Sequence, residues 1–230
     1  GNGVKIISMA TSSSTDPCLL VAADSDITDV SQLKGKNLAV GIGTDNHYQL
    51  VEMLALGGLT EDDINLYNLQ GVEAYAALTS GEIDCMQSIA PNTYQFVENG
   101  DVRILASMDQ TEGRNNQVLV VSPEFAEEHG DIVVRFLKVL QRAVDYYKEN
   151  PEECKDILVD YVGDNVNRDL MDEYMDKYDC SLHLNAEDKA YLERQYNFLY
   201  EHDMLSGPVD LETIYDDSFL IEAFGTTEAH

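Results

Sequence analysis

Cationic side chains are scarce in this sequence: 14 Lys and Arg stand against 43 Asp and Glu, which gives a formal net charge of -29 at pH 7. Nucleic acids and anionic membrane surfaces carry the same sign of charge and would repel such a chain. The acidic residues are spread along the sequence rather than collected in a tail. The composition therefore indicates a solvated acidic surface and argues against a nucleic-acid partner.

Long apolar runs are also missing. None approaches the roughly 18 residues that a membrane-spanning helix needs, and no basic segment followed by an apolar run opens the chain. The hydrophobic content is nevertheless 44% over 230 residues, which is enough to bury the core of one or two domains. We expect a globular protein, with no signal segment in this chain.

Cysteine is sparse and shows no metal-binding pattern. The four cysteines, at 18, 85, 154 and 180, form no C-x-x-C pair, and no histidines lie between them at zinc spacing. A metal site is therefore not expected. Cys154 lies in one expected helix and Cys180 follows the next, so a disulfide between them and two free thiols both remain open, with free thiols favoured.

Catalytic motifs are absent as well. The sequence has no G-x-S-x-G turn, no G-x-x-x-x-G-K-[ST] loop and no H-E-x-x-H helix. Gly41-Ile42-Gly43 lacks the third glycine of a dinucleotide-binding loop. His47 fits a ligand hydrogen-bond donor or a surface histidine equally well. We expect no enzymatic activity and no cofactor.

The stretch from Leu33 to Asn92 is the informative part of the chain. Apolar strands alternate there with segments of helical periodicity and with glycine-containing turns. The expected order is a strand at Leu38–Ile42, a helix ending at Gly57-Gly58, a strand around Ile64 and Leu66, a helix at Val72–Thr79, a strand at Ile83–Met86 and a helix opened by Pro91. This series of βα units predicts an α/β fold with a parallel or mixed sheet.

Three turns of this stretch join an apolar strand to a helix, at Gly43–His47, Gln70-Gly71 and Gln87–Asn92. Open α/β sheets bind ligands beyond the carboxyl ends of their strands, where helix N-termini present unpaired N–H groups. Each turn taken singly also fits an ordinary helix cap. The first-choice ligand contacts are Thr44, Asn46 and His47, and the second-choice contacts are Gln70, Gln87, Ser88 and Asn92.

The order of these pieces resembles a known family, the extracytoplasmic substrate-binding proteins of ABC importers. The nearest branch serves nitrate, alkanesulfonates, taurine and thiamine precursors. The motifs that carry the resemblance are Leu33-Lys34-Gly35-Lys36, Gly43-Thr44 with His47-Tyr48, Gly58-Leu59, Ala77-Leu78 with Gly81, Ile83-Asp84 and Ala90-Pro91. They cover about sixty residues in register, and a weaker likeness continues from Gln117 to about Tyr200.

The resemblance implies a two-lobed, type II periplasmic-binding-protein-like fold whose lobes are joined by two crossing strands. Residues 37–106 would form the smaller α/β lobe. Residues 1–36 and 107–230, with the C-terminal helices, would form the larger lobe. In that family a further βαβα segment comes first, so the resemblance also implies an N-terminally truncated larger lobe with an unpaired strand edge beside Val4–Met9 and an uncovered apolar face. That face would be covered by the rest of a longer protein, by a second copy, by a partner or by repacked C-terminal helices.

The function that the resemblance implies is capture of a small polar or anionic molecule in the cleft between the lobes, for delivery to the membrane subunits of an ABC importer. The protein would lie outside the cytoplasm, in the periplasm or as a cell-surface lipoprotein. Two other functions remain open on the same scaffold: an effector-sensing domain of a transcription regulator and an enzyme that processes thiamine precursors. The regulator would need a basic helix-turn-helix, which this sequence does not contain, and the enzyme would need a nucleophile.

Overall fold

The computed structural model describes residues 3–13, 16–162, 168, 175, 177–205 and 207–228. The chain divides into two compact units. Unit 1 contains Gly1–Ser12, Asn116–Asp172 and Tyr178–His230. Unit 2 contains Ser13–Asn115 and Glu173–Lys177. Each unit is described by itself below.

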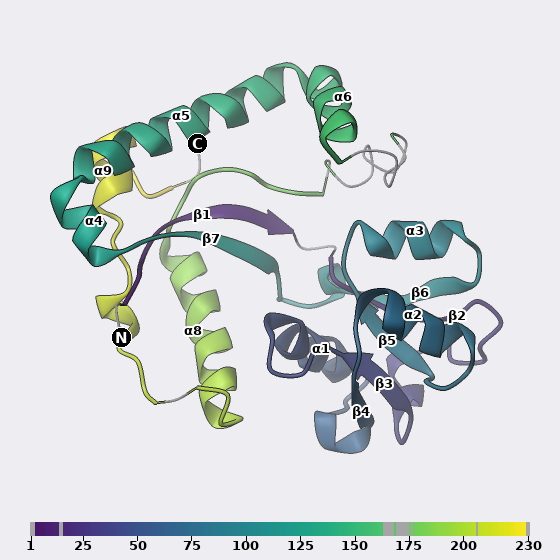
Figure 1. Ribbon diagram of the computed structural model, residues 1–230. Helices are drawn as coiled ribbons and strands as arrows, with labels where there is room; N and C mark the ends of the chain where they lie inside the picture. Colours follow the sequence, from purple (N-terminus) through teal and green to yellow (C-terminus); the bar gives the residue numbers. More distant parts are fainter. Residues whose placement is uncertain are drawn as a thin grey trace. The chain divides into compact units, whose positions relative to one another are not determined.

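Unit 2 is built on a five-stranded mixed sheet in the order β4-β3-β5-β2-β6 (Figure 1). Its strands are β2 (Cys18–Ala22), β3 (Asn37–Val40), β4 (Asn65–Asn68), β5 (Cys85–Ser88) and β6 (Val102–Ser107). Strand β3 runs parallel to both β4 and β5, whereas β2 runs antiparallel to β5 and β6. The expected α/β fold with a mixed sheet is confirmed.

Helices cover both faces of this sheet, so the side chains on both faces of its central strands are buried. The helices are α1 (Asp45–Ala55), α2 (Gly71–Thr79) and α3 (Asn92–Glu98), with 3-10 turns η1 (Val30–Leu33), η2 (Glu61–Asp63) and η3 (Met108–Gln110). Along β3, Leu38 and Val40 join the cluster that contains Leu50 and Met53 of α1. The residue between them, Ala39, joins the cluster of α2 and α3 on the other face. The two faces of β3 therefore pack against different helices, as the alternation of side chains along a strand requires.

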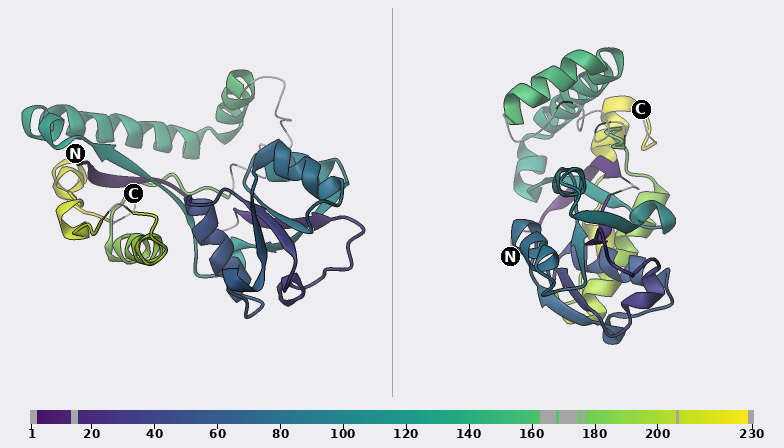
Figure 2. Two further views of the ribbon diagram at one scale, coloured as in Figure 1. Left: turned by 60° about the horizontal axis from the view of Figure 1, so that its bottom comes forward. Right: turned by 90° about the vertical axis from the view of Figure 1, so that its right-hand side faces the viewer.

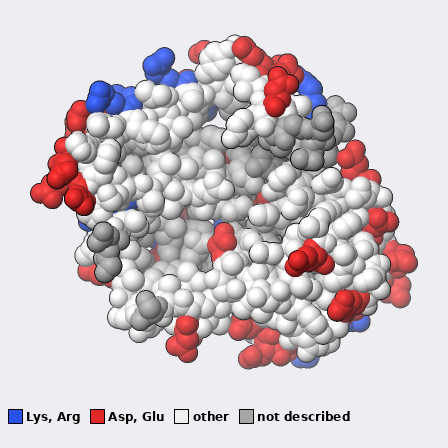
Figure 3. Space-filling view, in the orientation of Figure 1, with Lys and Arg blue, Asp and Glu red and all other residues white. Residues whose placement is uncertain are grey.

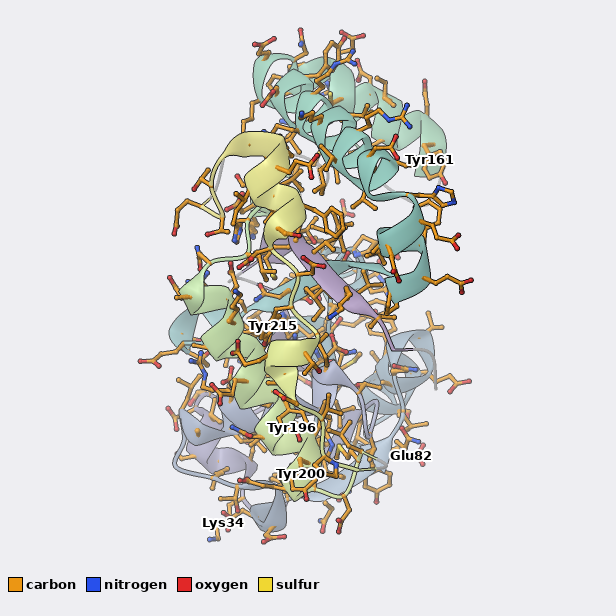
Figure 4. The ribbon with its side chains drawn as sticks, turned by 90° about the vertical axis from the view of Figure 1, so that its left-hand side faces the viewer. Lys34, Glu82, Tyr161, Tyr196, Tyr200 and Tyr215 are labelled. Atoms are coloured by element: carbon orange, nitrogen blue, oxygen red, sulfur yellow. The ribbon has the colours of Figure 1, made fainter. Side chains whose placement is uncertain are left out.

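Unit 1 has only a small sheet, in which β1 (Lys5–Ser13) pairs with β7 (Asn115–Val121). Bridges from Ile6 to Tyr215 and from Ser12 to Asp179 occupy the other edge of β1. The helices are α4 (Pro123–Glu128), α5 (Gly130–Glu149), α6 (Pro151–Val162), α8 (Ala186–Glu201) and α9 (Ser218–Phe224), with the 3-10 turn η4 (Leu211–Thr213). Figure 2 shows α5 as the long helix of this unit, and Figure 4 places Tyr196 and Tyr200 on α8 and Tyr215 on the segment beside it.

Helix α5 is unusual in this acidic protein. It carries Arg135, Lys138, Arg142 and Lys148, four of the chain's 14 cationic residues. Figure 3 shows Lys and Arg gathered along the edge where α5 lies. The helix buries one face, which includes Val133 and Leu137, against β1 and α9.

The boundaries of the units differ from the sequence-based expectation. The sequence predicts a smaller lobe over residues 37–106, whereas unit 2 runs from Ser13 to Asn115 and also takes in Met175 and Lys177. One reason is that β2, which the sequence-based expectation leaves outside the smaller lobe, pairs with β5 and β6 inside the sheet of unit 2, a contact between distant segments that local periodicity cannot reveal. No helix within the described residues is both long and apolar enough to cross a membrane.

Candidate functional site

The three turns singled out in the sequence meet around one cavity in unit 2. The cavity measures about 190 Å³ and is lined by Asn46, Gln70, Gly71, Gln87, Ser88, Ile89 and Asn92. Because β4 and β5 both run parallel to β3, the carboxyl ends of these strands lie at the same edge of the sheet. That edge is where the sequence analysis expects a ligand.

The polar lining residues sit at helix starts or at a strand end. Asn46 is the second residue of α1 and Asn92 the first of α3. Gln70 occupies the N-cap position of α2, but its side chain makes no capping hydrogen bond. A Cβ at Gly41 would lie 2.8 Å from Gln70 Oε1, so a glycine at the end of β3 leaves room for this amide. Gly71 has φ +57, a backbone conformation that glycine adopts without strain.

Hydrogen bonds within the site orient two of its side chains. Gln87 Nε2 donates to Asn46 Oδ1 at 3.4 Å, and the hydroxyl oxygens of Thr93 and Ser88 lie 3.0 Å apart, within hydrogen-bonding distance. Gln87 and Ser88 are each only 5% exposed. Among the described residues, the lining contains amides and a hydroxyl but no charged side chain. It can therefore bind polar groups, and within the described residues no acid or base side chain lines the cavity beside the Ser88 hydroxyl.

Asp16 holds the turn between β5 and α3, and the sequence analysis did not single it out. Its carboxylate is 2% exposed, and both oxygens accept from the backbone N–H of Ala90, at 2.9 and 3.0 Å. The two residues are 74 positions apart. An aspartate in a serine-rich loop resembles any turn residue, so local sequence gives no signal for this contact.

Two of the first-choice contacts, Thr44 and His47, do not line the cavity. Thr44 Oγ1 donates to the carbonyl of Gly41 at 2.6 Å, so its hydroxyl hydrogen is already used within the turn. His47 is 3% exposed, and its Nε2 lies 3.2 Å from Glu61 Oε2. The interpretation of His47 as a surface histidine is therefore wrong. Successive helix residues point about 100° apart, so Asn46 and its neighbour His47 cannot both face the cavity.

Helix dipoles add to the polarity of the site. The first turns of α1 and α2 border the cavity through Asn46 and Gly71, and helix N-termini carry a partial positive charge of about half an elementary charge. These backbone groups favour the negative end of a bound molecule.

The cysteines are all unpaired, which agrees with the favoured expectation. Burial, with a smaller effect of the nearby Asp16, raises the pKa of Cys18 to about 12. Burial also raises the pKa of Cys85 far above its usual range. Both thiols therefore stay protonated at neutral pH and are poor nucleophiles. No group of acidic, histidine or cysteine side chains within the described residues has the arrangement of a metal site.

Larger hollows lie elsewhere but have a different character. One of about 430 Å³ lies in unit 1 between α8 and residues 209–215, and another of about 600 Å³ lies between α5 and α6. Charged side chains such as Glu193, Glu212 and Arg142 border them. Neither lies at the carboxyl ends of parallel strands, so the smaller uncharged cavity of unit 2 is the stronger candidate.

A protein-family model described as "NMT1/THI5 like" matches residues 1–154. Among curated proteins, the chain is 27% identical over 206 residues to one from Bacillus subtilis (strain 168), described as an aliphatic sulfonates-binding protein, and the match covers 89% of this chain and 61% of that protein. It is 30% identical over 129 residues to the taurine-binding periplasmic protein of Escherichia coli (strain K12), a match that covers 55% of this chain and 40% of that protein. The chain thus spans less than two thirds of the length of these relatives.

Solved structures show the same fold. The periplasmic aliphatic sulphonate binding protein SsuA from Escherichia coli matches with a TM-score of 0.81 and 22% identity, over 93% of this chain and 73% of that one. The alkanesulfonate-binding protein SsuA from Xanthomonas axonopodis pv. citri, bound to MOPS, matches with a TM-score of 0.79 and 20% identity, over 94% and 74% of the two chains. The desulfurization enzyme DSZB matches with a TM-score of 0.76 and 17% identity, over 97% and 80%. The fold therefore serves both binding proteins and an enzyme.

Proposed function

Because the chain belongs to the NMT1/THI5-like family, we propose that it is the solute-binding component of an ABC import system and takes up a small polar or anionic organic molecule. Sulfonates, taurine, nitrate and thiamine-precursor-like molecules are the candidate ligands. The observation that carries the proposal is the uncharged polar cavity at the meeting point of the three strand ends. The names of the sulfonate- and taurine-binding relatives support the same ligand class.

The chemistry of the lining favours a neutral polar group or a single negative charge. Backbone N–H groups at the starts of α1 and α2, the Asn46 amide and the Ser88 hydroxyl can all donate hydrogen bonds. No Lys or Arg in the described part of the chain borders the cavity to balance a second negative charge. A doubly charged phosphate, which proteins commonly bind with Arg or Lys, therefore fits this site poorly.

The proposal treats the protein as non-enzymatic and extracytoplasmic, with the membrane subunits of the importer as its partners. The lining residues that the structure describes include no histidine, acid or base, and relatives are named as periplasmic binding proteins. The similarity to DSZB makes an enzyme on the same scaffold the second candidate. Release of a product from a bound sulfinate or pyrimidine would favour that candidate.

Isothermal titration against methanesulfonate, ethanesulfonate, taurine, nitrate and a pyrimidine precursor tests the proposal. We expect at least one of them to bind more tightly than millimolar. Asn46→Ala should weaken that binding by about 10- to 100-fold, which corresponds to the roughly 1.5–3 kcal/mol of a hydrogen bond to a charged group. The matched control is Gln117→Ala, an exposed amide on β7 of unit 1. Millimolar or weaker binding of every compound would count against the proposal.

The proposal also includes a covering for unit 1, either the remaining polypeptide of a longer protein or a second copy of the chain. No residue of β7 is fully buried. On α5, Ile132, Phe136 and Val139 are 40%, 51% and 57% exposed. The apolar face of α5 is thus only partly used within this chain. Light scattering during gel filtration would reveal a second copy, whereas a monomer that binds solute at micromolar affinity would show that neither covering is needed.

A further inference from the structure

Two buried hydroxyl groups lie side by side at the candidate site. Ser88 is the last residue of β5 and borders the cavity. Thr93 is the second residue of α3, is 1% exposed and does not border the cavity. Their oxygens are 3.0 Å apart, which is hydrogen-bonding distance. Within the described part of the chain, neither hydroxyl has another hydrogen-bonding partner.

The surroundings decide which hydroxyl donates. The two hydroxyl groups carry one hydrogen each, and the hydrogen bond between their oxygens uses one of these two hydrogens. If Ser88 donated to Thr93, the Thr93 hydrogen would be left in the interior without an acceptor, which is costly. If Thr93 donates to Ser88, the Thr93 hydrogen is used and the Ser88 hydrogen is free to point into the cavity. Only the second arrangement gives each of the two hydroxyl hydrogens an acceptor once a ligand occupies the cavity.

We propose that Thr93 is a positioning residue: its hydroxyl donates to Ser88 Oγ and so commits the Ser88 hydroxyl to donate its hydrogen to an acceptor atom of the bound molecule. This inference rests on the proposed function, since it assigns a role within the same site. The Ser88 hydrogen then needs an acceptor atom, such as an oxygen, at the end of the ligand that lies beside Ser88. Thr93 itself does not touch the ligand.

The first test needs no ligand. In protein labelled with ¹³C and ¹⁵N at Thr and Ser, NMR should detect a slowly exchanging Thr93 hydroxyl proton, because that proton is buried and hydrogen-bonded. The Ser88 hydroxyl proton, which faces the water-accessible cavity, should exchange too fast to be seen. In Ser88→Ala the Thr93 signal should shift and exchange faster. A protected Ser88 proton, or the absence of a protected Thr93 proton, would overturn the inference.

The second test is a double-mutant cycle of binding, with ethanesulfonate as the probe. Ser88→Ala should weaken binding about tenfold or more, since it removes a hydrogen bond to a charged group. Thr93→Val should weaken it by about three- to tenfold, and Thr93→Ser, which keeps the donor, should stay within about twofold of wild type. If Thr93 acts through Ser88, Thr93→Val should cost nothing further in the Ser88→Ala background.

The outcomes separate this inference from the proposed function. Additive losses in the cycle, or a Thr93→Ser variant as weak as Thr93→Val, would mean that Thr93 supports the fold and does not orient Ser88, whatever the ligand. If no compound binds wild-type protein, the proposed function fails, and the hydroxyl-proton measurement still decides how the pair is oriented.

Discussion

Replacing Asp16 should disturb the candidate site from a distance. The Asp16 carboxylate accepts from the N–H of Ala90 with both oxygens, at 2.9 and 3.0 Å, in a place where Asp16 is 2% exposed. Ala90 lies in the turn that joins Ser88 to Asn92, and both of these line the cavity. Asp16→Ala leaves the Ala90 N–H without its acceptor and removes the tie between this turn and the start of β2.

The size of the effect follows from the type of bond. A hydrogen bond to a charged group contributes about 1.5–3 kcal/mol to the free energy of unfolding. For a protein of this length, about 1 kcal/mol shifts Tm by roughly 2–4 °C, so Asp16→Ala should lower Tm by about 3–12 °C. Asp16→Asn keeps one acceptor oxygen at nearly the same place. It should cost less, about 0.5–2 kcal/mol, because the uncharged hydrogen bond that remains still contributes about 1 kcal/mol.

The assay combines thermal unfolding, followed by circular dichroism, with isothermal titration of the best ligand found for wild type. Both variants should lose affinity in the same order as they lose stability, because both loosen the turn that carries Ser88 and Asn92. An Asp16→Ala protein within about 1 °C of wild type, the range of a neutral surface substitution, would refute the reasoning. So would an Asp16→Asn variant less stable than Asp16→Ala.

Other consequences of the structure can be tested in the same protein. Gly57→Ala should destabilise it by about 1–3 kcal/mol in a urea titration, since the added Cβ would lie 2.4 Å from a backbone nitrogen in η1. Cys18 and Cys85 should not react with a disulfide reagent until the protein unfolds, because burial raises the pKa of both thiols and excludes the reagent. The hydrogen bond from Lys34 holds the pKa of Asp63 below its ordinary value of 3.8. The stabilising effect of this bond is therefore present above the unfolded pKa and is lost as the pH falls through the lowered folded value. In Lys34→Met, NMR titration should show that pKa rising toward 3.8.

Each of these has a control or a contrary outcome. Gly207→Ala places its Cβ in open space and should leave stability unchanged. A Gly57→Ala protein as stable as the Gly207→Ala protein would disprove the argument that the added Cβ clashes with η1. Rapid labelling of either buried thiol in folded protein would contradict its burial, while the half-exposed Cys154 provides the reactive reference. An unchanged Asp63 titration in Lys34→Met would assign the shift to the backbone of Thr60 instead.

Local periodicity determined which elements unit 2 contains. The strands and helices expected between Leu38 and Pro91 are present, with boundaries shifted by a few residues. Gln70, Gln87 and Asn92 could be chosen from sequence because each lies between an apolar strand and a helix, and parallel strands bring such positions to one edge. That reasoning needs only residue type and chain order, which are properties of the sequence itself.

Tertiary structure alone decided which side chains at the carboxyl ends of β3, β4 and β5 point into the cavity. Asn46 borders the cavity while His47 is buried beside Glu61, a choice set by the rotation of α1 on the sheet. The bond from Asp16 to Ala90 joins positions 74 residues apart. The extent of unit 2 follows from the pairing of β2 and β6, which are far apart in the chain. A periodic pattern records which face of an element is apolar, but it carries no information about the distant partner that the face meets, and so these features could not be predicted from it.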